Sequence, residues 1–78
     1  MTPADRTRRI LREHLGVSDE QLTDDAHLAD DLGADSLDPV EIALAVEDEF
    51  SITVTDDETA ACTTVGDWIK LVEGRVGL

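Results

Sequence analysis

The sequence predicts an all-α fold, a four-helix bundle with three longer helices, one short helix and a long first loop. Threonines followed three residues later by an acid recur along the chain, which is the capping-box pattern of helix starts. Apolar residues after these starts return every three or four positions, the period of an amphipathic helix. Alternation typical of a strand is limited to Ile52 and Val54, which is too short to indicate a sheet.

The first helix is expected over residues 3–15. Thr2 suits the N-cap, Pro3 suits the first helical position, and Asp5 lies three residues after the cap. Gly16 follows as a stop signal. The apolar stripe of this helix consists of Ile10, Leu11 and Leu15.

A long loop is expected from Gly16 to Asp35, because neither a helical nor an alternating pattern persists there. Connections of this length are uncommon in compact domains and usually serve a function. We expect the loop to be held on the core by four spaced apolar side chains, which are Val17, Leu22, Leu28 and Leu32.

The second helix is expected to start with Ser36 as its N-cap and to end near Phe50. Pro39 then occupies the third helical position, where its missing N–H costs no intrahelical hydrogen bond. The expected inward face consists of Ile42, Val46 and Phe50. The acids that fall mainly on the outward side are Asp38, Glu41, Glu47 and Asp48.

Two further capping boxes predict the remaining helices. Thr55 with Glu58 opens a short helix that ends near Ala61, and Thr64 with Asp67 opens the last helix. The residues that share one face of the last helix are Val65, Trp68, Ile69, Val72 and Val76.

The charge is the first indication of function. Six basic residues against nineteen acidic ones give the 78-residue chain a formal net charge of −13. No Lys or Arg lies between Glu13 and Ile69. Nucleic acids and anionic membranes require a basic face, so we expect neither nucleic-acid binding nor stable membrane binding. Basic patches on other proteins are the expected partners.

Length and composition indicate a single domain over residues 1–78, expected to be a monomer. The lone Cys62 excludes an internal disulfide, and no His/Cys spacing indicates a metal site. The N-terminus lacks a secretory signal pattern, and the longest apolar run, residues 42–46, is far too short to cross a bilayer. We therefore expect a cytoplasmic protein.

Ser36 lies in the stretch 30–38, where Gly33 permits a sharp turn before a helix opens. Spacing alone allows Ser36 to be an N-cap without any further role. A hydrolase nucleophile elbow requires glycine two residues either side of the serine, where this chain has Ala34 and Asp38. A calcium loop fails because Gly33 stands at the fourth position of the stretch instead of the sixth. We expect no catalytic residue and no enzyme activity.

The segment Asp31-Leu-Gly-Ala-Asp-Ser-Leu-Asp38 resembles the signature of acyl carrier proteins. Similarity to this family also covers Val40-Glu41-Ile42 and runs nearly from end to end. The resemblance implies that Ser36 receives 4′-phosphopantetheine from coenzyme A through a phosphopantetheinyl transferase that uses magnesium. A phosphodiester at this position is expected to meet free N–H groups and the positive end of the helix dipole.

By the same resemblance, the second helix is expected to dock on ketosynthase, acyltransferase, reductase and dehydratase enzymes through their basic patches. The acids of the expected partner-recognition set are Asp35, Asp38, Glu41, Glu47 and Asp48. Small apolar contacts between them are expected from Leu37, Val40 and Leu44. The residues expected to line a cavity for the acyl chain are Leu28, Ile42, Val46, Val54, Cys62 and Trp68.

The resemblance therefore implies a carrier of acyl intermediates, held as thioesters on an arm at Ser36. The pattern over residues 35–41 is closest to carriers of fatty acid biosynthesis, and the end of the chain soon after the last helix favours a discrete carrier. A carrier of a polyketide or other secondary-metabolite pathway stays open, as does an acidic helical adaptor that binds basic proteins unmodified. Trp68 stands where the family often has a smaller side chain, so we expect it to shorten or close the acyl cavity. Ordinary packing in the core is the alternative explanation for a tryptophan at position 68.

Overall fold

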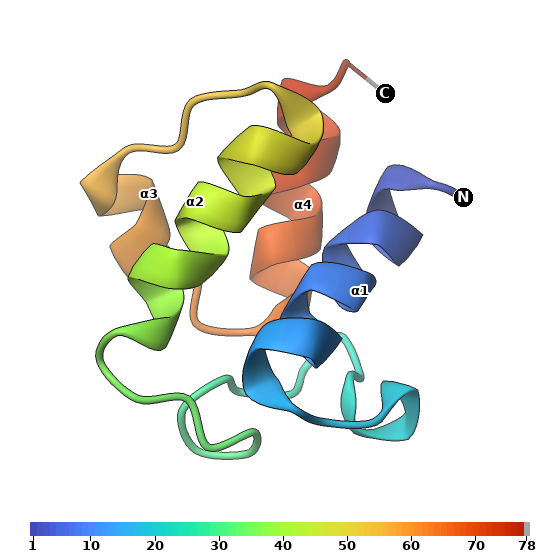
Figure 1. Ribbon diagram of the computed structural model, residues 1–78, viewed down its shortest axis with the longest axis vertical. Coiled ribbons are helices and arrows are strands. Elements are labelled where there is room, and N and C mark those ends of the chain that lie inside the picture. Colours follow the sequence, from blue (N-terminus) through green and yellow to red (C-terminus); the bar gives the residue numbers. More distant parts are fainter. Residues whose placement is uncertain (78) are drawn as a thin grey trace.

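The computed structural model describes residues 1–77, and every regular element in them is a helix, which confirms the predicted all-α bundle (Figure 1). The elements are α1 (Pro3–Leu15), the 3-10 turn η1 (Asp19–Gln21), α2 (Asp38–Phe50), α3 (Asp56–Ala61) and α4 (Val65–Arg75). Figure 1 shows α1, α2 and α4 as the body of the bundle, with α3 at the outer side of α2. Within the described part of the chain, no helix has the length and apolar character needed to cross a membrane.

Three capping boxes are present as predicted and explain where α1, α3 and α4 begin. The hydroxyls of Thr2, Thr55 and Thr64 each accept a hydrogen bond of 3.1 Å from the N–H three residues further on. The acid at that position accepts a hydrogen bond from the N–H of the threonine in return. Each N-cap of this kind stabilises its helix by about 1 kcal/mol. Gly16 ends α1, also as predicted, in a left-handed conformation with φ of 67°.

The predicted start of α2 is wrong by one residue. Leu37 is the N-cap in place of Ser36, so Asp38 is the first helical residue and Pro39 the second. Proline fits there because the first N–H groups of a helix have no partner within it. The cause of the shift is the Asp35 carboxylate, whose Oδ1 accepts hydrogen bonds from the N–H of Leu37 at 2.9 Å and of Asp38 at 3.2 Å. This carboxylate performs the capping that was expected of the serine hydroxyl.

The hydrophobic core joins α1, α2 and α4, and Trp68 of α4 is its largest fully buried side chain. The other apolar side chains that are fully buried are Leu11, Ile42, Val46, Val65 and Val72. Of the predicted inward residues, Phe50 and Val76 are only half-buried. No residue of α3 is buried, so this short helix contributes little to the core.

The long loop between α1 and α2 is held on the core as predicted. Its buried anchors are Leu22, Leu28, Leu32 and a further one, Ala26, while Val17 is half-buried. Backbone hydrogen bonds also join the loop to the start of α4. The Leu28 N–H donates to the Thr63 carbonyl at 2.9 Å, and the Val65 N–H donates to the Ala26 carbonyl at 3.1 Å. These bonds fix the path of the chain shortly before Ser36.

Polar contacts from neighbouring helices hold α3 in place. The Glu47 carboxylate of α2 accepts a hydrogen bond from the Val54 N–H at 2.9 Å. Arg75, at the end of α4, donates to the Thr53 carbonyl and forms an ion pair with Glu58. An element with few apolar contacts opens at a lower free-energy cost than the core helices. We therefore expect α3 to be the most mobile of the four helices.

Candidate functional site

Ser36 is exposed in the short segment between the long loop and α2. The two acids that flank it close a turn by exchanging hydrogen bonds. Asp35 Oδ1 accepts from the N–H groups of Leu37 and Asp38, and Asp38 Oδ2 accepts from the Asp35 N–H at 2.9 Å. Within residues 1–77 the Ser36 hydroxyl has no hydrogen-bond partner. The turn thus fixes the backbone of Ser36 and leaves its hydroxyl free to react.

The expectation of free N–H groups at the start of α2 is wrong for residues 37–39. The N–H groups of Leu37 and Asp38 already donate to the Asp35 carboxylate, and Pro39 has no N–H. The positive end of the helix dipole remains at this position and favours an anion. A phosphodiester on Ser36 would therefore be favoured by the dipole without hydrogen bonds from the backbone of residues 37–39.

Ser36 differs from the other two serines of the chain in both geometry and position. Ser18 Oγ lies 3.2 Å from Gln21 Oε1 and belongs to the capping box of η1. Ser51 is the C-cap of α2, in a left-handed conformation with φ of 54°. The negative end of the helix dipole opposes a phosphate at Ser51. Ser36 is the serine that combines a free hydroxyl with a helix N-terminus.

Three large apolar side chains are exposed on α2 and the residue before it. Leu37 is 66% exposed, Val40 56% and Leu44 58%. Their spacing of three and four residues makes them neighbours on the helix surface. Contiguous apolar exposure of this kind, rimmed by acids, is typical of a protein interaction site. We call the predicted docking surface the α2 face; its residues are Asp35, Leu37, Asp38, Val40, Glu41, Leu44, Glu47 and Asp48.

Two acids of the α2 face also hold the fold together, which the sequence pattern did not indicate. Asp38 is half-buried and closes the turn around Ser36. Glu47 is half-buried and accepts the hydrogen bond from the segment before α3. By contrast, Glu41 and Asp48 are exposed, and their carboxylates make no hydrogen bond or ion pair within the described residues. They are the acids of the face most open to a basic partner.

A small pocket opens beside Ser36, between the long loop, the start of α2 and α3. Its volume is about 150 Å³, and Asp35 is one of its lining residues. The apolar part of its lining consists of Leu28, Ala29, Ala34, Pro39, Ala60 and Cys62. Of the six residues expected to line an acyl cavity, the structure therefore places Leu28 and Cys62 at this pocket. The other four, Ile42, Val46, Val54 and Trp68, lie in the core cluster that also contains these two.

Cys62 is the one thiol of the chain and forms part of the pocket wall. Burial, together with the nearby Asp67 carboxylate, raises the pKa of Cys62 to about 11. A thiol with this pKa stays protonated at neutral pH and is a poor nucleophile.

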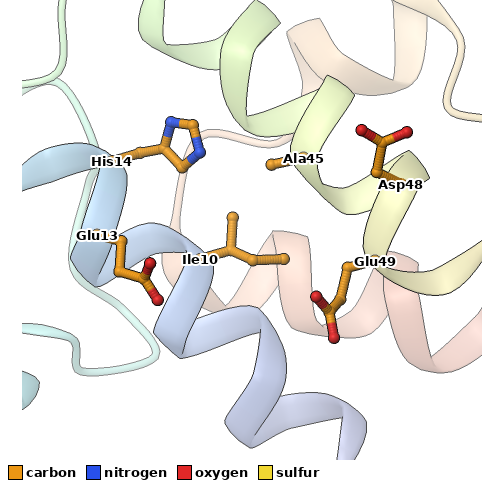
Figure 2. Close-up of a pocket in the computed structure, with 6 residues that line it drawn as sticks. All are labelled: Ile10, Glu13, His14, Ala45, Asp48 and Glu49. Atoms are coloured by element: carbon orange, nitrogen blue, oxygen red, sulfur yellow. The ribbon is translucent and has the colours of Figure 1, made fainter.

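A second hollow of about 340 Å³ lies between α1 and α2 (Figure 2). Its lining residues are Ile10, Glu13, His14, Ala45, Asp48 and Glu49. Figure 2 shows Ile10 between the carboxylates of Glu13 and Glu49. Glu49 accepts a hydrogen bond from Arg6 Nε at 2.8 Å and lies 3.5 Å from Arg9. Arg9 also lies 3.7 Å from Glu13, so arginines of α1 pair with two of the three acids of the hollow, and Asp48 is the acid that they do not reach.

In the part of the chain that the structure describes, no base contacts the Ser36 hydroxyl. Within residues 1–77 neither His14 nor His27 hydrogen-bonds to the serine, and the His27 Nδ1 accepts instead from the Asp30 N–H at 3.3 Å. A serine nucleophile requires a base within hydrogen-bond reach. In the same part of the chain, no group of three His, Cys, Asp or Glu side chains has an arrangement suited to a metal ion.

Comparison with known protein families agrees with the geometry of this site. A family model described as "Phosphopantetheine attachment site" matches residues 5–72 of the 78-residue chain. The matched range includes Ser36 and its turn, the α2 face, and the pocket beside the serine.

Proposed function

The chain belongs to the family of phosphopantetheine attachment-site domains, and from this premise we propose that Ser36 is the residue that receives the group. Domains of this family carry 4′-phosphopantetheine, are modified by a phosphopantetheinyl transferase and interact with biosynthetic enzymes, and they are not catalytic themselves. In this proposal the chain carries acyl intermediates as thioesters and delivers them to enzymes of fatty acid biosynthesis in the cytoplasm.

The observation that carries the proposal is the free, exposed hydroxyl of Ser36 at the N-terminal end of α2. An exposed hydroxyl without a partner enters a transferase active site without breaking a contact in the fold. The hydrogen bonds between Asp35 and Asp38 hold the backbone on both sides of the serine, so the loop needs little ordering when it binds. The residues present thus fit the attachment of a phosphodiester.

The arm supplies a thiol that holds acyl groups as thioesters, and the chain's own residues determine where that thiol goes. The dipole of α2 favours the phosphodiester, while the exposed carboxylate of Asp35 repels it. We expect these opposed effects to keep the arm in solvent instead of fixing it to the surface. A mobile arm raises the effective concentration of its cargo at each enzyme that the carrier docks on.

The α2 face is the proposed docking surface for the transferase and for ketosynthase, acyltransferase, reductase and dehydratase enzymes. Its exposed leucines and valine offer apolar contact, and Glu41 and Asp48 offer charges without partners in residues 1–77. Electrostatic complementarity of this kind raises the rate of association more than the affinity. A carrier that visits several enzymes in turn needs such fast and weak contacts.

A carrier of a polyketide or other secondary-metabolite pathway is the second candidate. The observation that favours it is the small size of the pocket beside Ser36, about 150 Å³, together with the complete burial of Trp68. A long saturated chain does not fit into this volume without displacing core side chains. The resemblance of Asp35-Ser-Leu-Asp38 and Val40-Glu41 to fatty-acid carriers supports the first candidate.

Reconstitution with purified enzymes separates these candidates. The modified protein is loaded with malonyl groups and incubated with the ketosynthase, reductases and dehydratase of a fatty-acid synthase, with Ser36→Ala as the control. Elongated and fully reduced chains on the parent protein support the fatty-acid proposal. Loading without elongation by these enzymes, but with elongation by a polyketide ketosynthase, supports the second candidate instead.

A further inference from the structure

Lys70 is the only lysine of the chain. The other five basic side chains are arginines, which stay protonated and are therefore not nucleophiles, whereas the amine of a lysine is a known site of acylation. A protein whose proposed cargo is a thioester thus exposes a single side-chain amine to that cargo.

Lys70 lines a hollow of about 340 Å³ between α3 and α4. The other residues that line this α3–α4 hollow are Glu58, Ala61, Cys62, Asp67 and Leu71. The hollow adjoins the pocket beside Ser36, because Cys62 lines both of them. Lys70 therefore lies one side chain away from the surroundings of the proposed attachment site.

A phosphopantetheine arm on Ser36 is long enough to reach this hollow. About fifteen atoms follow in line from the serine oxygen to the sulfur of the arm, and an extended chain of that length spans roughly 17 Å. The fold itself measures 18 Å along its shortest axis. The thiol of the arm therefore extends from Ser36 past the end of α3 to the α3–α4 hollow.

The Lys70 amine is exposed and is not held in an ion pair. All five arginines pair with acids, whereas Lys70 pairs with none in residues 1–77. The two acids of the α3–α4 hollow already have other partners. Glu58 forms an ion pair with Arg75, and Asp67 accepts hydrogen bonds from two backbone N–H groups. The amine of Lys70 is thus free to meet a reactive group that enters the hollow.

We infer that Lys70 is an acyl acceptor, to which the carrier transfers acyl groups from the thiol of its own arm. The inference rests on the proposed attachment of that arm at Ser36. The neutral amine attacks the carbonyl carbon of the thioester, so that a C–N bond forms and the C–S bond breaks. The sulfur leaves as a thiolate and takes up the proton that the amine loses. The products are an amide on Lys70 and a free thiol on the arm.

The N-terminal amine is the natural control for this reaction. It is the other amine of the chain, and Figure 1 shows the N-terminus on the opposite side of the bundle from α3. α-Amino groups as a class lose their proton at lower pH than lysines, so a larger fraction of them is neutral and reactive. Acylation without positioning therefore also marks the N-terminus, whereas transfer along the arm marks Lys70.

Intact mass after treatment with hydroxylamine tests the inference. Ser36 is first loaded with a butyryl-phosphopantetheine arm, and complete loading is verified by mass. The protein is incubated at about pH 8 and then treated with hydroxylamine, which cleaves thioesters on the arm or on Cys62 but leaves amides intact. We expect the parent to retain one butyryl group, located at Lys70 by peptide mapping, and Lys70→Arg to retain none. Retention on the N-terminus, on both amines equally, or on neither would overturn the inference.

Dilution and a free thioester show whether the arm directs the transfer. Dilution of the loaded parent by about tenfold should leave the first-order rate unchanged, because the reaction is intramolecular. Ser36→Ala with about 10 µM free butyryl-pantetheine should acylate Lys70 roughly 100-fold more slowly, because a short tether gives an effective concentration in the mM range. A rate that falls with dilution, or an equal rate with the free thioester, would overturn the inference. Failure of Ser36 to gain the arm would overturn the proposed function with it, whereas full loading without transfer to Lys70 would overturn this inference alone.

Discussion

The substitution Glu41→Gln is predicted to slow modification by a phosphopantetheinyl transferase without destabilising the fold. Glu41 is exposed in the first turn of α2, and its carboxylate has no hydrogen bond or ion pair within residues 1–77. A basic group of a partner at about 4 Å gains about 1 kcal/mol in water, and measured exposed pairs contribute about 0.2–1 kcal/mol. Loss of one such pair should lower kcat/KM for the carrier roughly 1.5- to 5-fold. Urea denaturation should show the free energy of unfolding unchanged within about 0.5 kcal/mol.

Glu20→Gln is the matched control for this prediction. Glu20 is an exposed acid of η1, outside the α2 face, and its replacement changes the net charge by the same amount. The control should retain the parent kcat/KM at low salt. At about 1 M NaCl, where the Debye length is about 3 Å, the difference between the two variants should disappear. Equal losses in both variants, or a loss in Glu41→Gln that survives high salt, would refute the assignment of the α2 face.

Further predictions concern stability. Arg6→Ala should lower the free energy of unfolding in urea by about 1–3 kcal/mol, because the Arg6 guanidinium hydrogen-bonds to Glu49 and lies 4.6 Å from the centre of the Phe50 ring. Arg12→Ala, which removes an ion pair with the exposed Asp19, should cost less than about 1 kcal/mol, and equal losses in the two arginine variants would contradict this difference. Burial raises the pKa of Asp67, but hydrogen bonds from two threonines lower it further, so the net pKa lies below its usual 3.8. The stabilisation that the Asp67 carboxylate gives the fold is therefore complete above pH 3.8 and should be lost as the pH falls below that value. In Asp67→Asn the free energy of unfolding should fall less steeply over the same pH range. The melting temperature should rise with added NaCl, because nineteen acids face six bases, and a flat response would show that their repulsion is weak.

The helices could be predicted because their starts are encoded by local contacts. A threonine hydroxyl and an acid three residues further on bond to each other's N–H groups without help from the rest of the chain. The predicted bounds of α1 therefore agree with the structure, from Pro3 to Leu15. The start of α2 is harder to predict, because Asp35, Ser36 and Asp38 compete for the same N–H groups. The carboxylate of Asp35 takes them, which moves the N-cap to Leu37.

The surroundings of Ser36 could be predicted only in part. Exposure of Leu37, Val40 and Leu44 follows from helical spacing, and the structure shows it. The pocket does not follow from any local pattern, because its walls come from the long loop, α2 and α3 together. The same holds for the pairing of Arg6 with Glu49, which are 43 residues apart in the chain. Contacts of this kind depend on how the helices pack, and a single sequence carries no periodic signal for them.

Intact mass spectrometry shows whether Ser36 carries the phosphopantetheine arm. The parent, Ser36→Ala and Ser51→Ala are incubated with a broad-specificity phosphopantetheinyl transferase, magnesium and coenzyme A. Ser51→Ala is a fair control, because alanine keeps a Cβ at the left-handed C-cap position of α2. We expect a gain of one phosphopantetheine in the parent and in Ser51→Ala, and none in Ser36→Ala. No gain in the folded parent, beside a known carrier that is modified in parallel, would contradict it and favour an unmodified acidic adaptor.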